Sequence, residues 1–238
     1  MSSEIKADKW SPASGTAGTI GDNGDTFTVP SGVTLDIASG ATLDATGATV
    51  TGITDTNGLV KLGTVSTNNS NVSALTIDNC FSSTYNLYRI VGFHNATTNG
   101  AHNYFRWRTG GASGSSYTTG DYQWINTGRY INSNPATAEY HNWNYTADHG
   151  RVASDMDSDS NSSFVSFNLL VADPNTDLMS RGAVTGTSTV RQMTNDRWVT
   201  TQVGITNGAN VGATGFQMTV STGSISYGRV SVYGMEQA

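Results

Sequence analysis

Short apolar segments separated by closely spaced turn-forming residues run through most of this chain. The turn formers are Asn99-Gly100, Gly110-Gly111, Asn134-Pro135, Asp173-Pro174 and Asn207-Gly208. Glycine takes positive φ without steric cost, and proline and asparagine fit turn conformations. The segments between them are about five to ten residues long, and none shows the apolar repeat of a packed helix. We therefore predict an all-β fold.

The predicted strands are rich in β-branched and aromatic residues, which pack well on a pleated surface. Some alternate strictly, as in Leu87, Arg89, Val91 and Phe93. The predicted strands are 75–81, 86–93, 104–109, 122–131, 163–171, 198–204, 215–220 and 228–233. Short strands at such spacing are typical of a sandwich or jelly roll. We predict a β-sandwich (jelly-roll-like) head domain over residues 59–238, with 54–75 as the neck that leads into it.

A Gly-small-Thr-aliphatic unit repeats in the segment before this region. Its copies are Gly32–Asp36, Gly40–Asp44 and Gly47–Thr51. Each unit is a very short strand with a glycine turn, and it must stack on other copies to bury its aliphatic residue. Stacking around a threefold axis would place Leu35, Leu43 and Val50 inside a triangular shaft. We predict a trimeric β-repeat shaft over residues 1–58, and a loosely ordered Gly/Thr linker is the alternative.

Composition limits the partners and the location of the protein. Charged residues make up 13% of the chain, the net charge is −6, and the lysines and arginines are scattered. No row of cations is available for phosphates, so we expect neither nucleic acid nor an anionic membrane as partner. The single cysteine, Cys80, excludes an intrachain disulfide, and neither a secretory signal nor a membrane span is expected. An extracellular-type composition without a signal fits a virion protein made in a host cytoplasm.

The residues that could perform chemistry form no recognised catalytic pattern. The four histidines lack metal-site spacing, and Gly114–Ser116 is not a nucleophile elbow. Glycoside hydrolysis needs two carboxyls roughly 5–9 Å apart. Asp121, Glu139, Asp148 and Asp173 are candidates, but their positions do not indicate that any two converge. We predict a protein that is not an enzyme and has no cofactor or metal.

Asp155, Asp157 and Asp159 alternate as the first ligands of a calcium loop do. Ser160 stands where such a loop has its turn glycine, and Ser166 stands where it has its bidentate glutamate. We interpret the segment as an exposed acidic turn, with calcium binding as the alternative.

Ten aromatic residues gather between Tyr104 and Tyr145, interleaved with Asn, His, Gln and Arg. Half or more of these rings should fill the core. Residues 139–145 alternate aromatic with polar residues, so we expect one face of this segment in the core and the other exposed or at a subunit interface. Tyr and Trp suit interfaces and can stack on sugars, so some of these rings are predicted to contact a host glycan or a neighbouring subunit. The candidates are Tyr117, Tyr140, Trp143 and Tyr145.

Four stretches also have a recognisable residue order. They are Gly24–Leu35, which reads Gly-Asp-Thr-Phe-Thr-Val-Pro-Ser-Gly-Val-Thr-Leu, and Phe81–Ile90, Leu169–Pro174 and Gly228–Met235. The first resembles the repeat at the start of many fibre and appendage proteins of marine tailed phages, and the other three resemble the C-terminal domains of those proteins. The resemblance implies a homotrimeric virion-surface protein with a short shaft and a β-sandwich head.

The function that this resemblance implies is host adhesion by a short tail fibre or appendage. Trp10 and its neighbours would dock the chain onto other virion proteins of the tail or capsid. Only about twenty residues precede the repeat, which also suits a capsid decoration or cement protein that binds the major capsid protein. A glycan-degrading tail spike is a third possibility, and the sequence alone does not separate fibre from decoration.

Overall fold

The computed structural model describes most of the chain after residue 58. The described ranges are 59–131, 138–157, 164–174, 183–192, 197–207 and 212–235. The predicted shaft, 1–58, lies outside the described residues, and with it Leu35, Leu43, Val50 and Trp10. The described residues form β-strands and one short 3-10 turn, with no α-helix among them. The prediction of an all-β fold is confirmed.

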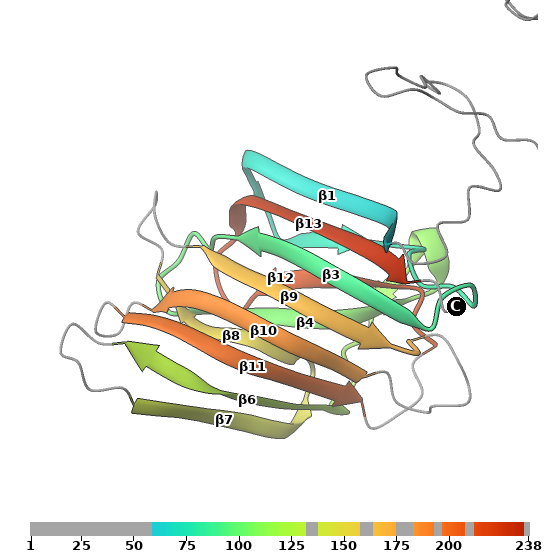
Figure 1. Cartoon of the computed structure of the whole chain (residues 1–238). Helices are drawn as coiled ribbons and strands as arrows, with labels where there is room; N and C mark the ends of the chain where they lie inside the picture. Colours follow the sequence, from blue (N-terminus) through green and yellow to red (C-terminus); the bar gives the residue numbers. More distant parts are fainter. Residues whose placement is uncertain are drawn as a thin grey trace, which may run out of the picture. The chain divides into compact units, whose positions relative to one another are not determined.

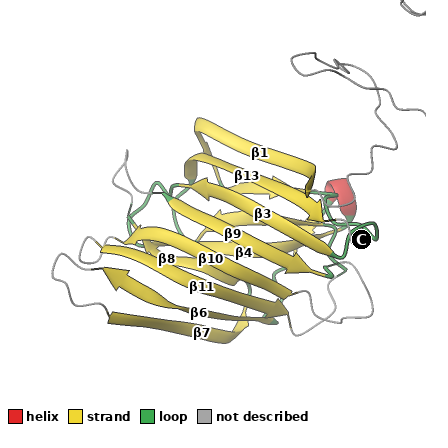
Figure 2. Cartoon of the chain, viewed as in Figure 1, coloured by secondary structure: helices red, strands yellow, loops and turns green. Residues whose placement is uncertain are grey.

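The strands lie in two layers, which Figures 1 and 2 show as a front and a back sheet. The front layer has the order β1, β13, β3, β9, β10, β11, β6 and β7, and each strand is antiparallel to its neighbours. Its bounds are β1 Leu59–Val72, β3 Leu87–His94, β6 Tyr122–Ile131, β7 Ala138–Ala147, β9 Val165–Ala172, β10 Ala183–Gln192, β11 Arg197–Asn207 and β13 Ile225–Met235.

The back layer is shorter and also antiparallel, with β2, β12, β4 and β8 side by side and the two-residue β5 beside β4. Its bounds are β2 Ala74–Ile77, β4 Ala101–Thr109, β5 Ser115–Ser116, β8 Gly150–Met156 and β12 Gly215–Val220. Gln192 of β10 pairs with Met156 of β8, which joins the two layers. The arrangement is sandwich-like.

Alternation along the strands sets the inner and outer sides of the front layer. In β9 the inward residues are Val165, Phe167, Leu169 and Val171, and every residue between them is exposed. A strand turns successive side chains to opposite faces, so one face of the front layer meets the core and the other, which we call the outer face, does not. The alternating set Leu87, Arg89, Val91 and Phe93 of β3 belongs to the outer face, and Tyr88 and Ile90 face the core.

Aromatic rings form the centre of the core between the layers. Phe105 meets Trp107 edge to face, with ring centroids 4.7 Å apart, and stacks on Phe216 at 5.9 Å. Phe81 packs edge to face on Tyr88 at 4.8 Å. Of the eight predicted aromatic side chains that the structure describes between residues 104 and 145, four are buried: Phe105, Trp107, Tyr122 and Trp124. The expectation that half or more fill the core is met within this set.

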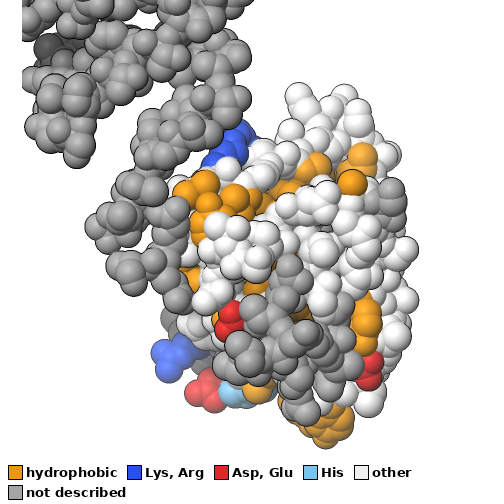
Figure 3. Space-filling model, turned by 90° about the vertical axis from the view of Figure 1, so that its right-hand side faces the viewer, with side chains coloured by type: hydrophobic (Ala, Val, Ile, Leu, Met, Phe, Trp, Pro, Cys, Tyr) orange, Lys and Arg blue, Asp and Glu red, His pale blue; other side chains and the backbone are white. Residues whose placement is uncertain are grey.

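Each predicted strand overlaps an observed one, but other strands were not predicted. The segment expected to be a neck is β1, a strand of the front layer paired with β13. β5, β7, β8 and β10 were also not predicted as strands. Figure 3 shows one side of the molecule, where few charged side chains lie among polar and hydrophobic ones. The part of the chain that is described contains no helix long and apolar enough to cross a membrane.

Candidate functional site

Exposed large hydrophobic side chains gather on the outer face of the front layer. Within the described residues they are Leu59, Phe93, Ile125, Trp143, Tyr145, Leu170 and Trp198. Each lies on a front-layer strand and alternates with core-facing neighbours, except on the edge strands β1 and β7. Exposed hydrophobic side chains that cluster on one face often mark a site of interaction. This face is therefore the first candidate for a binding surface.

One row of paired residues crosses the outer face. Trp143 pairs with Ile125, Ile125 with Gly204, Gly204 with Thr185, and Thr185 with Leu170. The row runs from β7 through β6, β11 and β10 to β9. Residues paired across antiparallel strands lie on the same face, so these five residues form a continuous track, in which Gly204 contributes only backbone.

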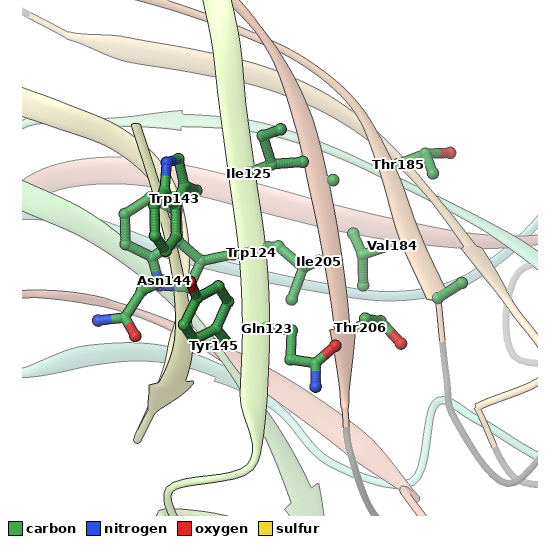
Figure 4. A pocket seen from close by; sticks show the side chains of 12 residues that line it. Gln123, Trp124, Ile125, Trp143, Asn144, Tyr145, Val184, Thr185, Ile205 and Thr206 are labelled. Carbon is green, nitrogen blue, oxygen red and sulfur yellow. The ribbon is translucent and has the colours of Figure 1, made fainter. Parts of the chain in front are cut away.

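A shallow apolar pocket of about 530 Å³ lies along the first part of this track. We call it the outer groove and define it by its outward-facing residues: Gln123, Ile125, Trp143, Tyr145, Ala183, Thr185, Gly204 and Thr206. Figure 4 shows the labelled side chains on four neighbouring strands. Trp124, Val184 and Ile205 also border the groove, but their side chains are buried on the core side. They therefore contribute through their backbone.

Trp143 and Tyr145 form an aromatic shelf at one end of the outer groove. Their ring centroids are 4.6 Å apart with planes inclined by 33°, and the residues are 57% and 61% exposed. Figure 4 shows the two rings side by side on β7, with Ile125 on the next strand. Because the two rings contact each other and are already exposed, they offer an apolar surface to a ligand without a conformational change.

The expectation that one face of residues 139–145 packs in the core is wrong for the six side chains of this segment that the structure describes. Glu139, His141, Trp143 and Asn144 are exposed, and Asn142 is half-buried. Within the described residues β7 pairs with β6 alone, at the end of the front layer. Apart from Ala147 at the end of β7, which is buried, the described side chains on both faces of this strand reach the surface.

The polar groups of the outer groove are uncharged. Asn144 borders the groove with an amide whose Oδ1 accepts from the backbone N–H of Thr146 at 3.0 Å, and no Asp, Glu, His, Lys or Arg borders the groove in the described ranges. Gln123, Thr185 and Thr206 offer one further amide and two hydroxyls. These three side chains make no hydrogen bond to another described residue, so their polar groups are available to a ligand. Binding sites commonly combine an apolar surface with a few polar groups that fix orientation.

A second pocket of about 360 Å³ continues the track on the outer face. Leu59, Arg89, Asn168 and Leu170 are among its residues, and Leu170 pairs with Thr185 of the outer groove. Arg89 Nε donates to Asn168 Oδ1 at 2.9 Å. The outer groove is therefore one end of a longer feature whose far end has a guanidinium held in place.

The other predicted contact residues are placed differently. Tyr117 is half-buried, donates its hydroxyl to Asp121 Oδ2 at 2.9 Å, and meets Tyr122 edge to face. It lies outside the outer groove. The side chain of Tyr140 is not among those described. The structure thus brings together Trp143 and Tyr145 and adds Ile125, which nothing in the sequence distinguished from a core residue.

The outer side of the back layer is charged instead. Arg108 Nε donates to Asp78 Oδ1 at 2.6 Å, and Arg106 donates to Asp148 Oδ2 at 2.8 Å. His149 lies 2.5 Å from Asp148 and stacks on Tyr104 at 3.5 Å. The ion-paired residues on the outer side of the back layer therefore contrast with the outer groove, whose described lining carries no charged side chain.

Charge and burial shift the pKa values of this ion-paired cluster. Burial by itself would raise the pKa of Asp148, but the hydrogen bond and charge of His149, together with Arg106, lower it. Burial lowers the pKa of His149 in spite of Asp148. Asp148 is thus held as a carboxylate by its partners, which is the opposite of the raised pKa that a general acid requires.

Two other candidate acids, Asp121 and Asp157, also lie beside polar or charged partners. Asp121 accepts hydrogen bonds from Tyr117 and Thr119, which lower its pKa with Thr119 the larger cause. Asp157 lies just after β8, with its carboxylate 3.8 Å from Arg191 Nη1. Asp159 lies outside the described residues. Across the described ranges no cluster of three or more His, Cys, Asp and Glu side chains could hold a metal ion.

Comparison of the chain with known proteins identified no similar protein. No protein-family model matches the chain, and no match was found among curated proteins or solved structures. We therefore infer the function from the outer face and the chemistry of its residues.

Proposed function

We propose that this chain is a structural, non-catalytic protein on the surface of a tailed-phage particle, where it binds the host surface as a short homotrimeric fibre or appendage. The observation that supports this function most is the gathering of the exposed large hydrophobic side chains on the outer face of the front layer. A face of that kind fits a protein whose role is to attach to another surface.

The chemistry of the outer groove favours binding over catalysis. General acid–base catalysis needs a titratable group within hydrogen-bond reach of the reacting atom. The described lining offers amide and hydroxyl groups and aromatic rings instead. Rings and neutral donors hold a ligand without transforming it.

A trimer would make weak contacts sufficient. Three identical heads on one axis raise avidity by orders of magnitude when they engage one surface together. The N-terminal repeat, with Leu35, Leu43 and Val50 as its proposed interior, would hold the copies together, and Trp10 would contribute to docking on the particle. Sedimentation equilibrium should give three times the chain mass of 25.1 kDa. A monomer at micromolar concentration would contradict the trimer.

Antibody labelling of intact particles, imaged by electron microscopy, tests the location. Label at the tail or its appendages is the expected result. Label at symmetric positions over the head would instead make the chain a capsid decoration protein, with the outer face against the major capsid protein. Particles without label would contradict a virion role altogether.

A further inference from the structure

We propose that the outer groove binds an uncharged linear glycan that lies across the strands, from the shelf of Trp143 and Tyr145 toward Leu170. This inference rests on the proposed binding function and gives its ligand a chemical class. It is drawn from the shape of the groove, its lack of charge and the glycine in its floor.

The groove is longer across the strands than along them. It touches four strands, which lie about 4.8 Å apart, so it extends for about 14 Å across the sheet. Along each strand it uses only two outward residues, such as Gln123 and Ile125 or Trp143 and Tyr145, a length of about 7 Å. Continuation to Leu170 on β9 adds one more strand. A ligand that fills this space is narrow and linear.

The aromatic shelf selects a ligand with flat apolar faces. The C–H face of a pyranose ring packs on an indole or phenol ring, as other apolar faces do. Trp143 and Tyr145 keep more than half of their surfaces exposed although they touch each other. The exposed rings offer room for a sugar at the β7 end of the track.

The groups beside the shelf match the hydroxyls of a sugar. Gln123, Thr185 and Thr206 each both donate and accept hydrogen bonds, as sugar hydroxyls do. An anionic glycan would need a cation to replace its lost hydration, and the described lining contains none. The first cation along the track is Arg89, in the adjoining pocket, where Asn168 already accepts from its Nε. The geometry therefore favours a neutral ligand.

Gly204 forms the floor of the groove between Ile125 and Thr185. A Cβ added there would lie 3.1 Å from Ile125 Cγ2, so the exposed Ile125 side chain would shift slightly, and a valine would project into the groove. Its backbone is not in the left-handed region, and valine suits a strand. Gly204→Val should therefore fill the groove in a folded protein and leave both aromatic rings in place.

Titration calorimetry with the full-length chain tests this assignment. The probes are maltohexaose, cellohexaose and N-acetylchitohexaose as neutral ligands, the matching trisaccharides, and hexagalacturonate as the anionic ligand. The variants are Trp143→Ala and Gly204→Val. The matched controls are Trp198→Ala, which removes another exposed tryptophan of the same face, and Gln202→Val, which adds a valine to β11 beside the groove. Circular dichroism checks the folding of every variant.

We expect at least one neutral hexasaccharide to bind, and both groove variants to weaken it by tenfold or more. The two controls should stay within about twofold of wild type. The hexasaccharide should bind more tightly than its trisaccharide, and Leu170→Ala should reduce that difference.

Three results would overturn the assignment. The first is that no neutral hexasaccharide binds, or that the affinity is unchanged in both Trp143→Ala and Gly204→Val. The second is tighter binding of hexagalacturonate. The third is a loss of oligomer mass in Trp143→Ala by sedimentation, which would make the face a contact between copies. If the purified chain blocks particle adsorption but binds no neutral glycan, this assignment fails and the proposed function stands.

Discussion

Trp143 on β7 lies directly opposite Ile125 on β6, and the two residues are 57% and 50% exposed. Trp107, in contrast, is 1% exposed at the centre of the core. The same residue type thus serves two purposes in one chain. One indole fills the space between the layers, and the other remains available at the end of the front layer.

Replacing these two tryptophans should separate stability from binding. Trp107→Ala removes a buried ring that packs on Phe81 and Phe105, and it should lower the free energy of unfolding by about 3–5 kcal/mol. Trp143→Ala removes an exposed ring, and it should change that free energy by less than about 1 kcal/mol. Urea denaturation of both variants measures the difference. Equal losses would mean that Trp143 is a structural residue.

Ser188 and Thr189 make a second matched pair, because they are neighbours on β10 with opposite surroundings. Ser188 is buried, donates its hydroxyl to the carbonyl of Val152 at 2.6 Å and meets Thr201 at 2.7 Å. Ser188→Ala leaves these groups short of a partner and should cost about 1–3 kcal/mol. Thr189 bonds Thr200 at the surface, so Thr189→Ala should stay within about 0.5 kcal/mol in the same denaturation experiment. A larger loss of stability in Thr189→Ala than in Ser188→Ala would contradict the placement of Ser188 in the core.

The ion pair of Arg108 with Asp78 should stabilise the fold more than that of Arg106 with Asp148. Arg108 donates to both carboxylate oxygens of Asp78, at 2.6 and 3.2 Å, and both residues are largely shielded from water. A double-mutant cycle with alanines should give a coupling above about 1 kcal/mol, as for hydrogen bonds to charged groups. Asp148 is half exposed, so its cycle should give at most about 1 kcal/mol. Added salt should reduce the second coupling more, and equal couplings would refute the ranking.

Stability should fall as the pH drops below neutrality. Complete burial lowers the pKa of His94 below its usual 6.5, and burial also lowers the pKa values of His102 and His149. The unfolded chain therefore binds protons on these rings at a higher pH than the folded chain does. The contribution of these neutral histidines to the free energy of unfolding is fully present above about pH 6.5. It is lost as the pH falls toward the pKa values of the folded state. The carboxylates with lowered pKa, Asp121 and Asp148, add a separate loss below 3.8.

His94→Gln should flatten this pH dependence, because glutamine does not take up the proton. The measurement is the free energy of unfolding at pH 7, 6 and 5, compared as a slope so that any constant cost of the substitution cancels. His141→Gln, which removes an exposed histidine of β7, is the matched control. An unchanged slope in His94→Gln would contradict the assignment to this ring.

The sequence allowed prediction of strands whose core-facing residues are large, such as β9 with Phe167 and Leu169. β10 was not predicted because small hydroxyl residues lie on both of its faces, with Ser188 inside and Thr189 outside. β1 escaped because its run of asparagines suits a linker. As an edge strand it depends on pairing with β13, more than 150 residues away in the sequence, and local pattern does not reveal such pairing.

The candidate site was predictable only in part. Aromatic and polar alternation in residues 139–145 indicated Trp143 and Tyr145, but it did not show that β7 ends the front layer and that both of its faces reach the surface. Ile125 and Gly204 carry no local signal at all. Their role depends on which strands lie side by side, and that is a property of the whole sheet.

The most direct test of the central claim is adsorption of particles to host cells with Trp143→Ala or Trp198→Ala built into the virion protein. Both variants lose one exposed indole from the same face, and only the first loses it from the outer groove. We predict that Trp143→Ala reduces the adsorption rate by tenfold or more while Trp198→Ala adsorbs as wild type does. Wild-type adsorption by particles that contain folded Trp143→Ala would contradict the account.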